Sequence, residues 1–380
     1  MTNAADFHDD LIIVDTHVDT IQRQVDLGQD LTAPDSGGYM DLPSMKKGNL
    51  TATFFAACVD YNNIKRGTAR QRQNQLLSAI IDFCDTNADT IAVARTSEDI
   101  RRLKAEGKLA AVITVEGAQA IEEDLAHLEE LHRLGVVSIA LAHFTSNTWA
   151  DSSADVARHG GISDLGRKAI AEMNRLGMII DVSHASDEAV IGALEASRAP
   201  IFASHSCARA LHDHPRNLTD DLIRAIADKG GVVGPTIFPE YIYAPFQAAT
   251  EVLAEEIRAE AGDDGPVEKG TPAITTIMRS FRGDMNGKYN SLVTKALPMP
   301  GIDVFVDHIA HIAALTSPAH VCVGTDHGAV RFDIPGWEDC TKLPALTDAL
   351  LARGFSRREV AMIMGENVLR LMDDVQAVAG

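Results

Sequence analysis

Four short apolar runs of the chain each end in a residue that can bind a metal ion. They are residues 11–17 (LIIVDTH), 109–116 (LAAVITVE), 178–184 (MIIDVSH) and 200–205 (PIFASH). Near-continuous apolar runs are typical of parallel strands that are covered on both faces. Parallel strands of one sheet end at the same edge, so the pattern predicts a site assembled there from residues far apart in sequence.

Further runs of this kind extend the series across the chain. Candidate strands lie near residues 11–17, 50–58, 109–116, 136–143, 178–184, 200–205, 231–236 and 320–326. Helical patterns separate many of them; one begins at Ser163, a residue that favours helix N-termini, and stops at Gly177. We therefore expect an α/β fold, a single (β/α)8 TIM barrel over residues 1–380, with a doubly wound open sheet as the alternative.

One long segment does not fit the alternation of strands and helices. About eighty residues, near 237–319, separate the last two candidate strands. An insertion of this length over the active face of a barrel predicts a lid or an oligomer contact.

The composition limits the classes of partner. The chain has 54 acidic and 34 basic residues and a formal net charge of −20, which argues against a nucleic-acid partner. The five cysteines include no CxxC pair, so we expect a reducing compartment and a cytoplasmic location. We identify no signal peptide and no apolar run long enough for a membrane span, and expect no membrane anchor.

The polar residues at the strand ends form one set when they are taken together. It consists of His17, Asp19, Glu116, His143, His184, His205 and Asp326. A catalytic zinc usually takes three protein ligands, so this set favours two metals that share a bridging carboxylate. We interpret the other histidines as surface or helix-packing residues, among them His8, His127, His132, His159, His308 and His311. Cys207 is expected to be a small buried group.

Several motifs resemble those of a known family. In chain order they are residues 15–19 (DTHVD), 116–117 (EG), 142–143 (AH), 147–152 (NTWADS), 181–184 (DVSH), 204–206 (SHS), 216–217 (RN) and 365–370 (GENVLR). Together they resemble the membrane (renal) dipeptidase family, zinc dipeptidases with a (β/α)8 fold of the metal-dependent hydrolase type.

The resemblance implies a role for each matching residue. His17 and Asp19 should hold one zinc, His184 and His205 the other, and Glu116 should bridge them. His143 should contact the substrate near the scissile carbonyl, and Arg216 should bind its terminal carboxylate. Asp326 should act as the acid/base, so that both it and His143 are catalytic and contact the substrate.

The chain departs from the family pattern at two places. The first motif commonly reads Asp-Gly-His-Asn-Asp, and here Thr16 and Val18 replace the second and fourth residues. The last strand usually ends Asp-Phe-Asp-Gly, whereas residues 324–328 read GTDHG, so that His327 replaces Phe-Asp after Asp326. The second departure concerns the shape of the pocket and the substrate preference.

The function implied is zinc-dependent hydrolysis of L-L dipeptides, and of L-D dipeptides, which the family often tolerates. A hydroxide that bridges two Zn²⁺ ions, themselves bridged by Glu116, would attack the peptide carbonyl. The main alternative is a binuclear metal amidohydrolase acting on N-acyl amino acids or other small amides. A non-catalytic peptide- or metal-binding protein and a scaffold protein are weaker alternatives. Family analogy favours a homodimer.

Overall fold

The strands form one parallel sheet. The computed structural model describes residues 4–34, 40–261, 298–328 and 334–380. Its strands run in the order β1-β2-β4-β5-β6-β7-β8, and all the pairs are parallel. They are β1 (Val14–Val18), β2 (Ala52–Cys58), β3 (Ile91–Val93), β4 (Leu109–Glu116), β5 (Val136–Ala140), β6 (Ile179–Asp181), β7 (Phe202–Ala203) and β8 (Val232–Val233).

The segment 321–327 joins the two edges of this sheet. Val321 forms a parallel bridge with Val233 of β8, and Val323 forms one with Asp15 of β1. His327 bridges Val18 further along β1. The last predicted strand thus lies between β8 and β1, although only isolated bridges form there. The curled, parallel α/β sheet of the expected barrel class is confirmed.

One strand was absent from the prediction. β3 pairs with residues 109–111 of β4, while β5 pairs with residues 113–115. β2 takes the other edge of β4 along its length. β3 has only three residues, too few for a run of apolar residues to stand out in the sequence.

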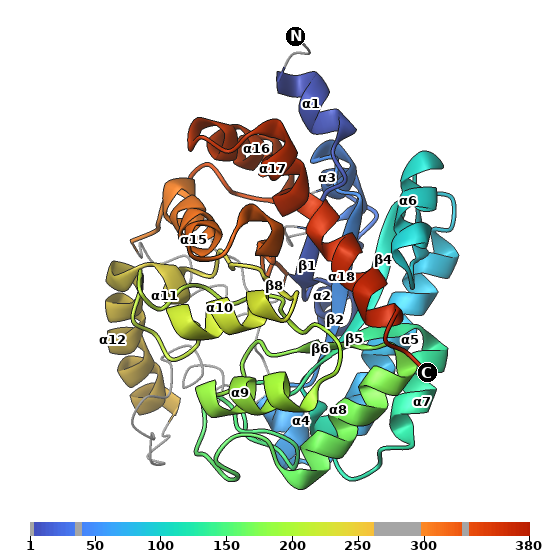
Figure 1. Ribbon diagram of the computed structural model, residues 1–380, viewed down its shortest axis with the longest axis vertical. Helices are drawn as coiled ribbons and strands as arrows, with labels where there is room; N and C mark the ends of the chain where they lie inside the picture. The colour runs from blue at the N-terminus through green and yellow to red at the C-terminus, as the bar shows by residue number, and fades with distance from the viewer. Residues whose placement is uncertain (1–3, 35–39, 262–297, 329–333) are drawn as a thin grey trace.

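Helices surround the strands (Figure 1). The helices of the N-terminal half are α1 (Ala4–Asp10), α2 (Ile21–Leu27), α3 (Leu42–Lys47), α4 (Tyr61–Lys65), α5 (Ala69–Thr86), α6 (Ser97–Ala105), α7 (His127–Leu134) and α8 (Asp164–Leu176). Those that follow are α9 (Asp187–Ala196), α10 (Asp220–Asp228), α11 (Pro239–Ile242), α12 (Ala244–Ala261), α15 (Ile302–Leu315), α16 (Leu343–Ala352), α17 (Arg357–Ala361) and α18 (Asn367–Gln376). As predicted, Ser163 caps α8 by accepting a hydrogen bond from the Gly166 amide, and Gly177 ends it with a φ of 72°.

Alternate strand residues pack in two different directions. One buried cluster contains Val14, Phe54 and Phe202 together with Leu369 and Met372 of α18. In Figure 1 α18, in red, lies in front of the strands. A second, larger cluster packs the opposite strand faces against the surrounding helices. The sheet is therefore buried on both faces, as the apolar runs predicted.

The C-terminal helical region fastens the segment that closes the sheet. The Asn367 side-chain amide donates to the backbone oxygens of Pro318 and Val321. Arg370 donates to the backbone oxygens of Gly230 and Ala319. These contacts hold the start of the segment that carries Asp326, so this part of the GENVLR motif is structural.

The insertion predicted over residues 237–319 is described only in part. Residues 237–261 contain α11 and α12, residues 298–319 contain α15, and residues 262–297 lie outside the described chain. Among the helices that the structure describes, none combines the length and apolar character needed to cross a membrane.

His308 is a packing residue of α15 and makes stability depend on pH. Its side chain is buried, its Nδ1 accepts from the Ala208 amide, and burial lowers its pKa from 6.5 to about 4. The unfolded chain therefore binds the proton more readily, and stability is lost as the pH falls from 6.5 through 4. The loss from this residue is about 3 kcal/mol.

Urea unfolding of the metal-free protein at pH 7 and pH 4 measures this loss. We expect His308→Gln to lose less stability than the wild type over that interval, because the glutamine does not titrate. An equal loss in the two proteins would exclude His308 as the source.

Candidate active site

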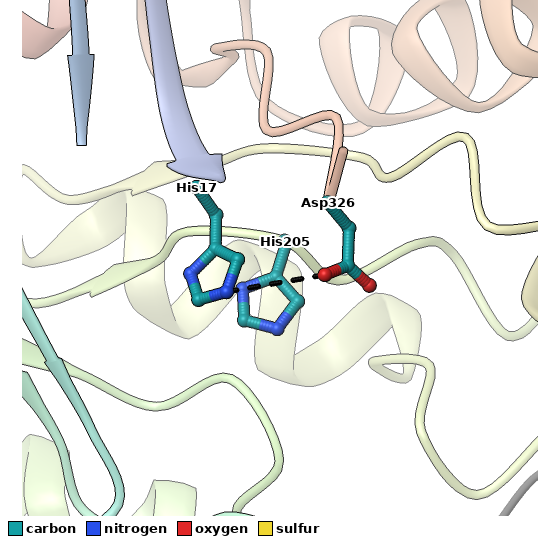
Figure 2. Close-up of side chains that lie close together, drawn as sticks. All are labelled: His17, His205 and Asp326. Carbon is teal, nitrogen blue, oxygen red and sulfur yellow. Dashed lines mark ion pairs between the residues drawn. The ribbon is translucent and has the colours of Figure 1, made fainter. Parts of the chain in front are cut away.

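The seven polar residues predicted at the strand ends come together at the C-terminal edge of the sheet. His17 lies within β1 and Glu116 ends β4, while Asp19, His143, His184 and His205 lie in the segments that follow their strands. Asp326 lies in the closing segment 321–327. Figure 2 shows His17 at the end of its strand, with the His205 and Asp326 side chains facing it from two other segments. The prediction that residues far apart in sequence would converge is confirmed.

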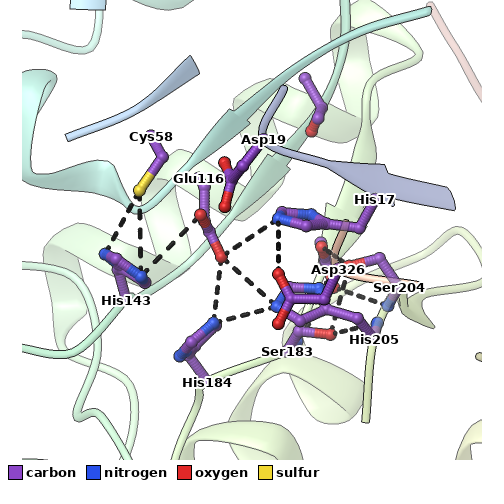
Figure 3. A network of polar contacts seen from close by, with 12 residues as sticks. His17, Asp19, Cys58, Glu116, His143, Ser183, His184, Ser204, His205 and Asp326 are labelled. Carbon is purple, nitrogen blue, oxygen red and sulfur yellow. Dashed lines mark hydrogen bonds and ion pairs between the residues drawn. The ribbon is translucent and has the colours of Figure 1, made fainter. Parts of the chain in front are cut away.

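Glu116 lies at the centre of the group. Its Oε1 is 3.0 Å from His184 Nε2, 3.3 Å from His205 Nε2 and 3.4 Å from His17 Nε2. Its Oε2 is 3.8 Å from His143 Nε2. Figure 3 shows the four imidazoles around this one carboxylate. A carboxylate within reach of several imidazoles has the position that a ligand shared by two metal ions would need.

The donor atoms group in a way that fits metal ions. Within 4.8 Å of one another lie donors of His17, Asp19 and Glu116, and likewise donors of Glu116, His184 and His205. All five residues are buried. Among the described residues His17 Nε2 and Glu116 Oε2 have no hydrogen-bond partner. Buried polar atoms are rarely left unpaired, and ions between these donors would satisfy them.

The site concentrates negative charge around His17. Burial alone would lower the pKa of this imidazole, but Glu116, Asp19 and Asp326 outweigh burial and raise it to about 10. Burial and Glu116 raise the pKa of Asp19 well above its ordinary value. The pKa values of His184 and His205 are held well below the ordinary value by burial. His184 and His205 are therefore neutral, the state that binds metal ions, whereas the proton that His17 carries among these carboxylates would have to be displaced by a bound ion.

Asp326 lies at the open side of the group. Its Oδ1 is 3.9 Å from His17 Nε2, and its side chain is 16% exposed. Burial raises its pKa to about 7, Glu116 adds to the rise, and His17 opposes it. A carboxyl group with a pKa near neutrality can both accept and donate a proton.

Two residues of the site have an unusual backbone conformation. His184 has a φ of 69° and Asp326 a φ of 63°, the left-handed region that non-glycine residues rarely adopt. The Asp326 amide donates to the His17 backbone oxygen, which helps to hold this conformation. Strained backbone of this kind is concentrated at functional sites.

His143 lies on the far side of Glu116 and contacts Cys58. The Cys58 sulfur is 3.7 Å from Nδ1 and 3.9 Å from Nε2 of the imidazole. The nearly equal distances indicate that the thiol packs against the ring and is not directed at either nitrogen. Burial lowers the pKa of His143, with Arg216 adding to the effect. A neutral imidazole can carry one N–H toward a substrate oxygen.

Arg216 presents two unpaired donors at the site. Its Nη1 donates to Ser206 Oγ at 2.7 Å, and its guanidinium carbon lies 5.6 Å from the centroid of the Tyr241 ring. Its Nε and Nη2 are buried, and no group in the described part of the chain accepts from them. These two nitrogens form one edge of the guanidinium, the geometry that binds a carboxylate through two parallel hydrogen bonds.

Several supporting residues were not predicted. Asp15 accepts hydrogen bonds from the His17 and Thr325 amides and from the Thr325 hydroxyl. Asp181 accepts in the same way from the Ser183 and Ser204 amides and from the Ser204 hydroxyl. The available signal was that each carboxylate stands two or three residues before a ligand histidine, at positions 15 and 181.

Comparisons with known proteins identify the family of this chain. The model of the membrane dipeptidase family (Peptidase family M19) matches residues 1–380. The chain is 28% identical over 353 residues to the dipeptidase tcpJ of Claviceps purpurea, a match that covers 91% of this chain and 71% of the relative.

Solved structures show the same fold. The probable dipeptidase PvdM from Pseudomonas aeruginosa superposes with a TM-score of 0.84 at 28% identity, over 99% of this chain and 98% of that one. A Rhodobacter sphaeroides metallopeptidase, liganded with a phosphinate mimic of L-Ala-D-Ala, superposes with a TM-score of 0.76 at 22% identity, over 96% of this chain and 100% of that one. The chain belongs to the membrane dipeptidase family, peptidase family M19, and is a hydrolase of peptide bonds.

Proposed function

We propose that this protein is a zinc dipeptidase with a binuclear centre. The observation that carries the proposal is the Glu116 carboxylate, whose Oε1 lies within 3.4 Å of three imidazole nitrogens. His17 and Asp19 would hold one ion, His184 and His205 the other, with Glu116 between them. Two such ions would lower the pKa of a water molecule and polarise the peptide carbonyl.

Arg216 would select substrates with a free terminal carboxylate. The unpaired edge formed by Nε and Nη2 is buried and matches the spacing of two carboxylate oxygens. Ser206 holds Nη1 and so fixes the orientation of that edge. A longer peptide carries an amide where the dipeptide has its carboxylate, and it would leave the arginine unpaired. This supports a preference for dipeptides.

His143 and Asp326 would handle the charge and the proton of the reaction. His143 would donate a hydrogen bond to the carbonyl oxygen as negative charge develops on it. Asp326 would take the proton of the attacking water and give it to the departing amine, a task suited to a pKa of about 7. The carboxyl group is partly exposed, so that it can reach a bound substrate.

Metal content and turnover test the proposal together. We expect close to two zinc ions per chain, and release of free amino acids from dipeptides that stops on chelation and returns with zinc. The panel should hold L-L and L-D dipeptides, because a solved relative binds a mimic of L-Ala-D-Ala, and N-acyl amino acids. Turnover of N-acyl amino acids alone would favour the amidohydrolase function, and a protein without bound metal would contradict both.

Replacing Arg216 should weaken binding of the substrate carboxylate. Hydrogen bonds to charged groups are worth about 1.5–3 kcal/mol, so we expect Arg216→Ala to raise KM about 10- to 100-fold with a smaller change in kcat. Dipeptide amides are the control, since they lack the carboxylate. The wild type should have a much lower KM for the free dipeptide than for its amide, and the variant should not distinguish the two. An undiminished preference in the variant would assign this role to another residue.

The single domain over residues 1–380, the homodimer and the cytoplasmic location stay predictions. Light scattering of the purified protein measures the number of subunits directly.

A further inference from the structure

A chain of buried hydrogen bonds leads from a carboxylate to the ring of His205. Asp181 Oδ2 accepts from the Ser204 hydroxyl at 2.5 Å, and Ser204 Oγ lies 2.7 Å from His205 Nδ1. On the other side of the ring, Nε2 is 3.3 Å from Glu116 Oε1. All four residues are at most 2% exposed. Figure 3 shows Ser204 beside the His205 ring, on the side away from Glu116.

The direction of each hydrogen bond that links Asp181, Ser204 and His205 is determined by its partners. Asp181 Oδ1 accepts from the Ser183 amide at 2.9 Å and from the Ser204 amide at 3.0 Å, so this carboxylate acts as an acceptor. The Ser204 hydroxyl has one proton to donate. It donates to the charged Asp181 Oδ2 at 2.5 Å in preference to Ser183 Oγ at 3.3 Å. Ser204 Oγ is then left to accept, and His205 Nδ1 must donate to it.

We infer that Asp181 and Ser204 form a relay that fixes His205 in the tautomer with its proton on Nδ1, so that the lone pair of Nε2 points at the metal centre. The inference rests on the proposed function, in which His205 binds a metal ion. Asp181 and Ser204 are positioning residues, since neither reaches the centre itself. Partners that orient a ligand histidine typically contribute about 10- to 100-fold in metal affinity.

His184, the other imidazole of this pair, has no such support. Its Nδ1 is buried and has no hydrogen-bond partner in the described part of the chain. Its Nε2 lies 3.0 Å from His205 Nε2, which suits two ligands of one ion. The orientation of this pair therefore depends on the relay at His205 and on the left-handed backbone at His184.

Asp181→Asn should reverse the direction of the hydrogen bonds in the relay, while the side chain at this position keeps its size. The asparagine oxygen must face the two backbone amides, so its NH₂ group faces Ser204 and donates to the hydroxyl. The Ser204 hydroxyl then donates to Nδ1, and the proton of His205 moves to Nε2, where it blocks the metal. Ser204→Ala removes the hydroxyl and leaves the tautomer unfixed.

The chain offers a matched control in Asp15 and Thr325. Asp15 accepts from two backbone amides and from the Thr325 hydroxyl at 2.5 Å, as Asp181 does from its own partners. In the described part of the chain the Thr325 hydroxyl forms no hydrogen bond with a ligand imidazole; it accepts from the His327 amide. Thr325→Val therefore removes an equally buried hydroxyl–carboxylate bond that does not belong to a relay.

Zinc affinity of the metal-free protein, measured against a competing chelator, is the first readout. We expect Asp181→Asn and Ser204→Ala to weaken one of the two sites about 10- to 100-fold, and Thr325→Val to change both by less than about threefold. Ser204→Thr, which keeps the hydroxyl, should lose less affinity than Ser204→Ala. Equal losses in Ser204→Ala and Thr325→Val, or no loss in Asp181→Asn, would overturn the relay.

Nitrogen-15 NMR of histidine-labelled, metal-free protein is the second readout and needs no metal. The His205 signals, assigned by their absence in His205→Gln, should show the proton on Nδ1 in the wild type and on Nε2 in Asp181→Asn. A wild-type proton on Nε2 would overturn the inference even if every variant folded poorly. The expected proton positions, Nδ1 in the wild type and Nε2 in Asp181→Asn, in a protein that binds no zinc would instead contradict the proposed function. The relay would still stand.

Discussion

Asp326→Asn should lower kcat about 10²- to 10⁴-fold, the usual contribution of a general acid/base. The amide has the size of the carboxyl group but cannot carry a proton from water to the leaving amine. The ion ligands and the Arg216 edge stay in place, so KM should change only a few-fold. The acid limb of the wild-type pH profile, which reflects ionisation of a carboxyl group with a pKa of about 7, should disappear.

The zinc content and thermal stability of Asp326→Asn serve as its controls. Both should match the wild type, because Asp326 is not among the proposed ligands, although its carboxylate lies within 4.8 Å of donors of His17 and His205. If the variant lost zinc in proportion to its activity, Asp326 would be a metal ligand and the proton carrier would have to be sought elsewhere.

Glu116→Gln should lower both the zinc content and the turnover, whereas Asp326→Asn should lower the turnover alone. The carboxylate is shared by three imidazoles at 3.0 to 3.4 Å, and it is also the nearest negative charge to the unpaired Nε2 of His17. An amide of the same size offers one neutral oxygen in place of two charged ones. We expect zinc to fall from two ions to at most one per chain, and kcat/KM to fall by at least about 10³-fold, since removing a bridging ligand disables both ions at once.

Glu122→Gln is the matched control for Glu116→Gln. Glu122 follows Glu116 by six residues on the same connection, and its side chain is exposed. Its loss should change neither the zinc content nor turnover. Full occupancy by two zinc ions in Glu116→Gln, measured by mass spectrometry of the native protein, would show that Glu116 does not bridge them.

The strand ends were predictable because burial and chemistry agree there. Residues 109–116 are apolar up to Glu116 apart from Thr114, and such a run, rich in β-branched residues, is typical of a parallel strand covered on both faces. The position of Glu116 at the end of that strand then follows from the sequence. His17, His184 and His205 were found by the same argument, and the structure brings all four together.

Other features depend on contacts that a sequence pattern does not contain. β7 and β8 have two residues each, and the closing segment 321–327 makes only isolated bridges, so their lengths were overestimated. Arg216 was identified only through family resemblance, because it lies in a loop. Which edge of its guanidinium is left unpaired depends on the hydrogen bond from Nη1 to Ser206, a contact that the sequence does not reveal. The direction of the Ser204 hydroxyl likewise depends on Asp181, 23 residues away.

The fastening of residues 318–321 by Asn367 and Arg370 ties the active site to a helix that lies outside it. His17, Glu116, His184 and His205 lie at strand ends that this helix does not hold, whereas Asp326 follows the fastened segment directly. A substitution in α18 is therefore expected to disturb the position of the acid/base before it disturbs the metal ligands.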